Sequence, residues 1–189
     1  MARAKAKTRS RKTAAKDDAI ALLKADHRQV EEWFGQFEKA RDDQRKQTLA
    51  TKICRALRVH TIIEEEIFYP AFLEATDDTD LHHEAEVEHN GAKALIAQIE
   101  ASGPDDDYYD AKVTVLSEMI KHHVKEEEQP GGMFAEARKS KMDLESLGAQ
   151  LAARKAELED ESADDDDMKP PPGGGKERVH VGRLMKGTR

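Results

Sequence analysis

The sequence predicts an all-α protein: an antiparallel up-down-up-down four-helix bundle with an additional C-terminal helix and disordered tails. Ala, Leu, Glu and Lys dominate the composition, and these residues favour helix. Apolar residues recur at spacings of three and four along five segments, which is the period of one helix face. The connections between the segments are short, and short connections make consecutive helices antiparallel neighbours.

The first two predicted helices each carry one apolar stripe. The first follows Asp17 and Asp18, either of which can cap a helix. Its stripe consists of Ile20, Leu23, His27, Val30, Phe34 and Phe37. The second begins near Asp43, and we expect Pro70 to kink or end it. Its stripe consists of Leu49, Ile53, Leu57, His60, Glu64 and either Ile67 or Phe68.

Three further helices follow a turn at Thr76–Asp80. The third ends at Ser102-Gly103-Pro104 and the fourth at Pro130-Gly131-Gly132. Their stripes are Ala85, His89, Ala92, Ile96 and Ile99, and then Tyr109, Val113, Leu116, Ile120, His123 and Glu127. The fifth is predicted from Met133 to about Leu158, with leucines at 144, 147, 151 and 158. We expect it to pack on the outside of the bundle or to extend away from it.

Composition divides the chain into three parts. Residues 1–16 contain seven Lys and Arg and no acidic residue, and they have almost nothing to bury, which predicts a basic disordered tail. Residues 17–158 form the predicted helical domain. Residues 159–189 are first acidic and then rich in proline and glycine around Pro170–Gly175, which predicts a second disordered tail.

The sequence also predicts a cytoplasmic location with no membrane partner. No apolar run approaches the roughly 18 residues that a membrane span needs. The basic start is not followed by the apolar segment of a signal peptide. The single cysteine, Cys54, rules out an internal disulfide and fits a reducing compartment.

Polar residues interrupt the four bundle stripes at corresponding positions. Each stripe contains one histidine, and on two helices a glutamate follows four residues later: His27, His60 with Glu64, His89, and His123 with Glu127. A spacing of four places both side chains on one helix face. Buried polar groups are costly unless they bind one another or a cation. Nitrogen and oxygen donors without thiolate suit iron, manganese or zinc, so the pattern predicts a metal site in the core.

The fourth helix offers two alternatives, because His122 and His123 are adjacent and point about 100° apart. We favour His123 with Glu127, which continue the apolar stripe. The alternative is His122 with Glu126, which continues a less apolar line. Taken singly, each histidine is typical of a hydrogen-bonded core residue, and each glutamate of a solvated acidic face. Tyr69 is interpreted as a packing residue.

The motifs together resemble those of the hemerythrin-like, HHE cation-binding domain. They are Asp26-His27-Arg28, His60-x-x-x-Glu64-Glu65 followed by Ile67-Phe68-Tyr69-Pro70, Glu88-His89, and His123-x-x-x-Glu127-Glu128. The resemblance spans roughly Asp17 to Phe134. It implies a four-helix bundle that holds two iron ions per chain, bridged by oxo or carboxylate groups. The ligand positions of that family fall on His27, His60, Glu64, His89, His123 and Glu127.

Two positions depart from the oxygen-carrying hemerythrins. Those proteins have two histidines four residues apart on the third helix, whereas here Ala85 stands four residues before His89. Glu86 and Glu88 are the residues of that helix that could fill the gap. On the fourth helix the family has an aspartate five residues after the histidine, where this chain offers Glu127 at four or Glu128 at five. The resemblance therefore implies the scaffold without reversible oxygen transport.

The resulting functional hypothesis is a di-iron protein that handles or senses iron, oxygen, peroxide or nitric oxide. One alternative is an enzyme in which the same centre consumes peroxide or nitric oxide. Another is a structural helical protein whose basic tail contacts nucleic acid. The chain is net −8 and has no recognised nucleic-acid motif, so we expect no nucleic-acid partner. The sequence assigns no oligomeric state.

Overall fold

The computed structural model describes residues 18–168, with 162–168 as backbone only. Four long helices dominate this part of the chain: α1 (Ala19–Lys39), α2 (Asp43–Ile63), α4 (Thr79–Glu100) and α5 (Tyr109–Glu128). The described residues contain no strand, so the all-α prediction is confirmed. None of the described helices is long and apolar enough to cross a membrane. Residues 1–17 and 169–189, and with them most of the two predicted tails, lie outside this range.

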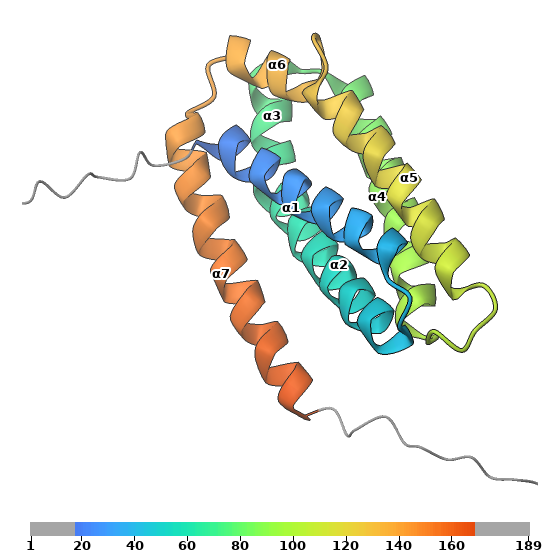
Figure 1. Ribbon diagram of the computed structural model, residues 1–189. Coiled ribbons are helices and arrows are strands. Elements are labelled where there is room, and N and C mark those ends of the chain that lie inside the picture. The colour runs from blue at the N-terminus through green and yellow to red at the C-terminus, as the bar shows by residue number, and fades with distance from the viewer. Residues whose placement is uncertain (1–17, 169–189) are drawn as a thin grey trace, which may run out of the picture.

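The four long helices form a closed bundle (Figure 1). α1 packs beside α2 and α4 beside α5, and the square closes through contacts of α2 with α4 and of α5 with α1. Aspartates begin the first two helices: Asp18 Oδ1 accepts a hydrogen bond from the Ala21 amide at 2.8 Å, and Asp42 caps α2 in the same way. Of the two caps that the sequence allowed for α1, the structure uses Asp18.

The second helix does not end at Pro70. α2 passes through one π-helical turn, η1 (Glu64–Phe68), into α3 (Tyr69–Thr76), and Pro70 lies in the first turn of α3. Proline has no N–H to offer the carbonyl four residues earlier, and its ring crowds that carbonyl. In the wider turn the Tyr69 amide bonds to the Glu64 carbonyl instead, five residues back, so the chain continues past the proline as helix.

The predicted fifth helix is two helices, α6 (Met133–Lys139) and α7 (Leu144–Met168). Ser140 Oγ accepts from the Met142 amide at 3.2 Å, and Asp143 Oδ1 accepts from the Ser146 amide at 3.0 Å, so local side chains end one helix and start the next. α7 lies along the outside of α1 and α2 (Figure 1). It continues to Met168, through residues assigned to the acidic tail, because no glycine or proline follows Leu158 before Pro170.

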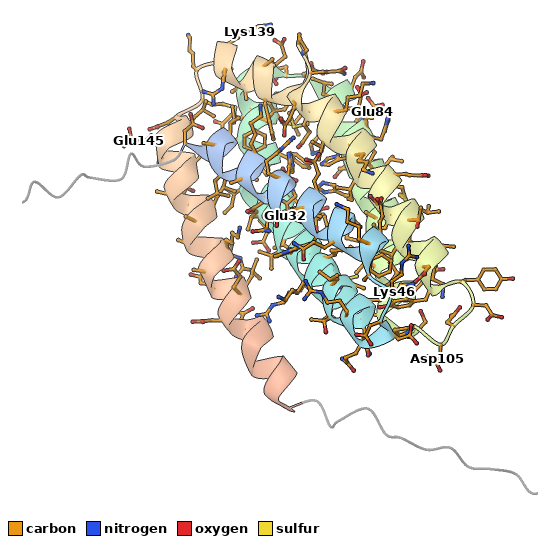
Figure 2. All side chains as sticks on the ribbon, in the orientation of Figure 1. Glu32, Lys46, Glu84, Asp105, Lys139 and Glu145 are labelled. Carbon is orange, nitrogen blue, oxygen red and sulfur yellow. The ribbon has the colours of Figure 1, made fainter. Side chains whose placement is uncertain are left out.

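The core consists of two hydrophobic layers with a polar layer between them; Figure 2 shows all the described side chains. One layer, near the α1–α2 connection, includes Phe34, Ile53, Ile96 and Leu116. The other, which α6 and α7 cover, includes Leu23, Phe68, Phe72, Phe134 and Leu151. The predicted histidines and glutamates occupy the layer between, so water has no direct access to them.

Candidate metal centre

All six residues predicted to bind metal converge in this polar layer. His27 comes from α1, His60 from α2, Glu64 from η1, His89 from α4, and His123 and Glu127 from α5. None of the six is more than 4% exposed. On the fourth helix the structure places His123 and Glu127 in the cluster. The His122 side chain is 58% exposed, and Glu126 bonds to Gln129 outside the cluster.

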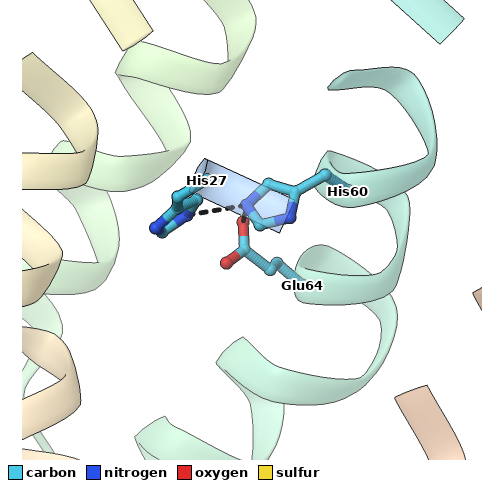
Figure 3. Close-up of side chains that lie close together, drawn as sticks. All are labelled: His27, His60 and Glu64. Carbon is cyan, nitrogen blue, oxygen red and sulfur yellow. Dashed lines mark hydrogen bonds and ion pairs between the residues drawn. The ribbon is translucent and has the colours of Figure 1, made fainter. Parts of the chain in front are cut away.

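The four imidazoles form two close pairs through their Nε2 atoms. His27 Nε2 lies 3.1 Å from His60 Nε2, and His89 Nε2 lies 3.3 Å from His123 Nε2 (Figure 3 shows the first pair with Glu64). A glutamate oxygen lies between the pairs on each side. Glu64 Oε2 is 3.3 Å from His60 Nε2 and 3.4 Å from His89 Nε2. Glu127 Oε2 is 3.4 Å from His27 Nε2 and 3.6 Å from His123 Nε2.

Two groups of three could therefore each hold a cation. His27, His60 and Glu64 form one group, and Glu64, His89 and His123 form the other; within each group the candidate donor atoms lie within 4.8 Å of one another. Glu64 belongs to both groups. A carboxylate has two oxygens, so the shared glutamate is the residue that could contact a cation in either group.

Four carboxylates outside the pairs face the imidazoles at Nδ1, and three of them are hydrogen-bonded to it. The Nδ1···O distances are 2.9 Å for His27–Glu128, 2.9 Å for His89–Glu65, 2.8 Å for His123–Glu88 and 3.6 Å for His60–Asp26. The first three are hydrogen bonds and the fourth is a longer ion-pair contact. α1 supplies the carboxylate for the histidine of α2, η1 the one for α4, α4 the one for α5, and α5 the one for α1. The four contacts therefore run once around the bundle.

The sequence pattern suggested Glu88 and Glu128 only as alternative ligands and gave Asp26 and Glu65 no role; none of the four was predicted to contact a histidine through Nδ1. A signal for them exists, because each is adjacent in the chain to a candidate ligand: Asp26 to His27, Glu65 to Glu64, Glu88 to His89, and Glu128 to Glu127. Adjacent helical residues point about 100° apart, so when one faces the axis the other faces a neighbouring helix. A charged residue beside each stripe ligand is therefore placed to contact the histidine of the next helix.

This bracing fixes which nitrogen faces the centre. A neutral imidazole whose Nδ1–H donates to a carboxylate has a bare lone pair on Nε2. Two such lone pairs about 3 Å apart repel each other unless a proton or a cation lies between them. Two buried carboxylate oxygens, Glu64 Oε1 and Glu127 Oε2, also have no hydrogen-bond partner. The nitrogen and oxygen atoms of this layer are therefore better suited to contact cations than to hydrogen-bond to one another.

The pKa values of the two buried glutamates are shifted in opposite directions. Burial, reinforced by the charge of Glu64, raises the pKa of Glu127 to about 8. Burial also disfavours the charge of Glu64, but His60 and His89 outweigh it and lower the pKa of Glu64 to about 2. Two carboxylates this close cannot both ionise without a compensating positive charge. In the metal-free centre Glu64 is ionised and Glu127 holds a proton.

Tyr69, interpreted from the sequence as a packing residue, has its hydroxyl inside the centre. The hydroxyl oxygen lies 3.1 Å from His89 Nε2, 3.3 Å from Glu127 Oε1 and 3.4 Å from Glu64 Oε2. Ala85, where the oxygen carriers have a histidine, is buried in the same hydrophobic layer as Tyr69. Glu86 is exposed and Glu88 braces His123, so among the described residues Tyr69 comes closest to replacing the missing histidine.

The fold and this layer define a helical bundle with a candidate cation site in its core. Residues 18–130 match the family model of the hemerythrin HHE cation binding domain, and the chain belongs to that family. Binding of cations is therefore a property of the domain.

Two known proteins show how far the similarity extends. A crystal structure of a hemerythrin HHE cation binding domain-containing protein from Mycobacterium kansasii superposes with a TM-score of 0.67 at 20% identity, over 80% of this chain and 93% of that one. At that identity the likeness establishes the fold. A DNA nickase from Nostoc sp. is 27% identical over 143 residues, which are 73% of this chain. The match spans only 39% of the nickase.

Proposed function

We propose that the protein holds two iron ions in the polar layer and uses them to handle or sense oxygen, peroxide or nitric oxide. The observation that carries the proposal is that Glu64 Oε2 lies within 3.4 Å of a histidine from each pair. His27 and His60 would hold one ion, His89 and His123 the other, and Glu64 and Glu127 would span them. Iron bound there supplies redox chemistry and positions open to a small ligand.

The size of the free space supports a small ligand. A cavity of about 10 Å³ lies beside the four histidines, closed by apolar side chains that include Val30, Leu57 and Ile120. A volume of this size accommodates roughly one water molecule. A ligand of one or two heavy atoms would need only small side-chain shifts to enter, whereas an organic substrate would require the helices to separate.

Metal analysis of protein purified without a chelating-tag step tests the proposal. After growth or reconstitution with iron we expect two iron ions per chain and the near-ultraviolet absorption of a bridged ferric pair. The His83→Ala variant is the control, because this exposed histidine of α4 is outside the cluster and its loss should leave both ions in place. A single zinc ion, or no metal after reconstitution, would contradict the proposal.

Tyr69 supports the enzymatic alternative, in which the centre consumes peroxide or nitric oxide. Burial, together with Glu64 and Glu127, raises the pKa of Tyr69 well above its usual value, so the phenol keeps its proton and its hydroxyl can hydrogen-bond a ligand inside the centre. A hydrogen-bond donor placed beside a ligand that gains negative charge on reduction stabilises that charge. We expect Tyr69→Phe to lower turnover while iron content stays at the wild-type level. Absence of turnover by the iron-loaded wild type would exclude this alternative.

Contact with DNA is a second candidate, which we propose on two observations. Residues 1–16 carry seven Lys and Arg, and one relative of the domain is a DNA nickase. Basic segments bind phosphates in a strongly salt-dependent way. Gel-shift and plasmid-nicking assays with the full chain and with a chain lacking residues 1–16 test it. Equal DNA binding and equal nicking by the two proteins would show that residues 1–16 do not contact DNA.

A further inference from the structure

A second group of metal-binding residue types lies on the outer surface between α4 and α5. Glu84 and Glu88 are one turn apart on α4, and His122 faces them from α5. Their candidate donor atoms all lie within 4.8 Å of one another. Glu84 and His122 are exposed and Glu88 is half-buried; Figure 2 labels Glu84 on the outside of the bundle.

Glu88 connects this surface group to the buried centre. Its Oε2 accepts a hydrogen bond from His123 Nδ1 at 2.8 Å, and His123 is one of the six residues of the centre. Its Oε1 is buried and has no hydrogen-bond partner, although His122 Nε2 lies 3.2 Å away. A cation held by Glu84 and His122 would satisfy that oxygen.

The basic side chains that contact Glu88 are two histidines, His122 and His123. Among the described residues, no Lys or Arg forms an ion pair with Glu84 or Glu88. Like charges one turn apart on a helix repel each other. Other surface glutamates of the same bundle do have basic partners, such as Glu65 with Lys93 at 2.7 Å and Glu66 with Arg154 at 2.8 Å. A cation bound between Glu84, Glu88 and His122 would offset the repulsion between the two carboxylates.

We propose that Glu84, Glu88 and His122 bind a divalent first-row metal cation at the surface, and that this site receives ions on their way to the buried centre. One imidazole and two carboxylates suit iron, manganese or zinc. Only the Glu88 carboxylate would separate an ion at this site from His123, because one Glu88 oxygen faces His122 and the other accepts from His123. The role in loading rests on the proposed di-iron function, whereas the surface site itself does not.

Manganese titration of the iron-loaded protein tests the surface site. Free Mn²⁺ gives a sharp six-line electron paramagnetic resonance signal in water, and binding removes it. We expect one Mn²⁺ per chain in the wild type. The double variant Glu84→Gln/His122→Ala should bind it at least about tenfold more weakly, since two of three ligands are gone. Glu88 is left unchanged because it also braces His123.

The control variant is His83→Ala/Glu86→Gln, which makes the same chemical changes at exposed positions of α4 outside the group. It should bind Mn²⁺ as the wild type does. The surface site is overturned if the wild type binds no Mn²⁺, or if the Glu84→Gln/His122→Ala variant binds it equally well.

The rate of iron uptake tests the loading role. We expect the Glu84→Gln/His122→Ala variant to take up iron more slowly than the control variant and to reach the same final iron content. Equal uptake rates would overturn the loading role. If even the wild type fails to take up two irons, the proposed function fails, and the manganese titration of the protein as isolated still decides the surface site.

Discussion

Each buried histidine of the centre uses its two ring nitrogens for different contacts. Nδ1 faces a carboxylate of a neighbouring helix and Nε2 faces the middle of the bundle. The carboxylates thus fix the orientation of each ring and increase the basicity of the nitrogen that faces the metal position. The residues that bind metal and the residues that orient them are neighbours in the chain.

Removing one of these carboxylates should weaken metal binding without removing a ligand. For Glu65→Gln, which alters the brace of His89, we expect roughly 10–100-fold lower iron affinity. Glu126→Gln is the control, since Glu126 bonds to Gln129 and not to a histidine of the centre. Competition with a chelator measures both affinities. Equal affinities in the two variants would show that the brace does not contribute.

The two adjacent histidines of α5 should respond differently to replacement. His123 lies in the centre, so His123→Ala removes an inward-facing nitrogen and should lose at least one of the two irons. His122 is largely exposed, and His122→Ala should keep both. Metal analysis of the two purified variants decides between them. Greater iron loss in His122→Ala would mean that α5 is rotated by one residue from the position described.

Position 85 tests whether the centre has room for the histidine found in oxygen carriers. Ala85 is 4% exposed and lies in the layer that contains Tyr69, whose hydroxyl already contacts His89. We expect Ala85→His to overpack this layer and to lower stability by roughly 1–3 kcal/mol. Chemical denaturation measures the change, with Glu86→His as an exposed control on the same helix. A stable variant with tighter iron binding would show instead that the position is open.

At the scale of the helices, the apolar stripes were sufficient to predict which residues gather in the core. The π-helical turn within the second long helix could not be predicted from them. His60 on α2 and Ile96 on α4 each belong to a series of residues spaced three and four apart. That spacing is sufficient to place each series on one face of its own helix. The π turn at Glu64–Phe68 has no such signature, because the same residues also suit an ordinary helix turn. That turn sets where Tyr69 points, which is why its hydroxyl was missed.

α7 extends the domain beyond the residues that match the family, and it contributes to the core. Leu151 is fully buried between α7 and the bundle. Lys155 forms an ion pair with Asp26, the carboxylate that faces His60, so α7 also contacts the outer shell of the centre. This helix is therefore part of the folded unit.

Truncation of Leu151 measures what α7 contributes. We expect Leu151→Ala to lower the free energy of unfolding by about 2–5 kcal/mol, the usual range for a fully buried leucine. The exposed neighbour in the Gln150→Ala variant should change it by less than about 0.5 kcal/mol. Thermal unfolding of the two variants compares them. A Leu151→Ala protein as stable as the wild type would mean that α7 does not dock.

At the scale of the whole molecule, the polar layer is a break in an otherwise continuous core. Hydrophobic layers above and below keep water out, and they also make uncompensated charge in the layer costly. Without a metal, protons provide part of the compensation. Burial raises the pKa of Glu127 to about 8, and the Glu88 carboxylate helps to raise the pKa of His123 against the effect of burial, so at pH 7 the Glu127–His123 pair holds a proton.

Metal binding should therefore release protons, since a metal ligand must be deprotonated. Between about pH 6.5 and 9 we expect affinity to rise with pH. Over the same range the metal-free protein should lose stability, because groups with a raised folded pKa stabilise when protonated and lose that contribution as pH rises through the folded pKa. Calorimetric titration of zinc in buffers of different ionisation enthalpy counts the protons released. Identical heats in all buffers would show that none leaves, and that Glu127 and His123 are already deprotonated in the metal-free protein.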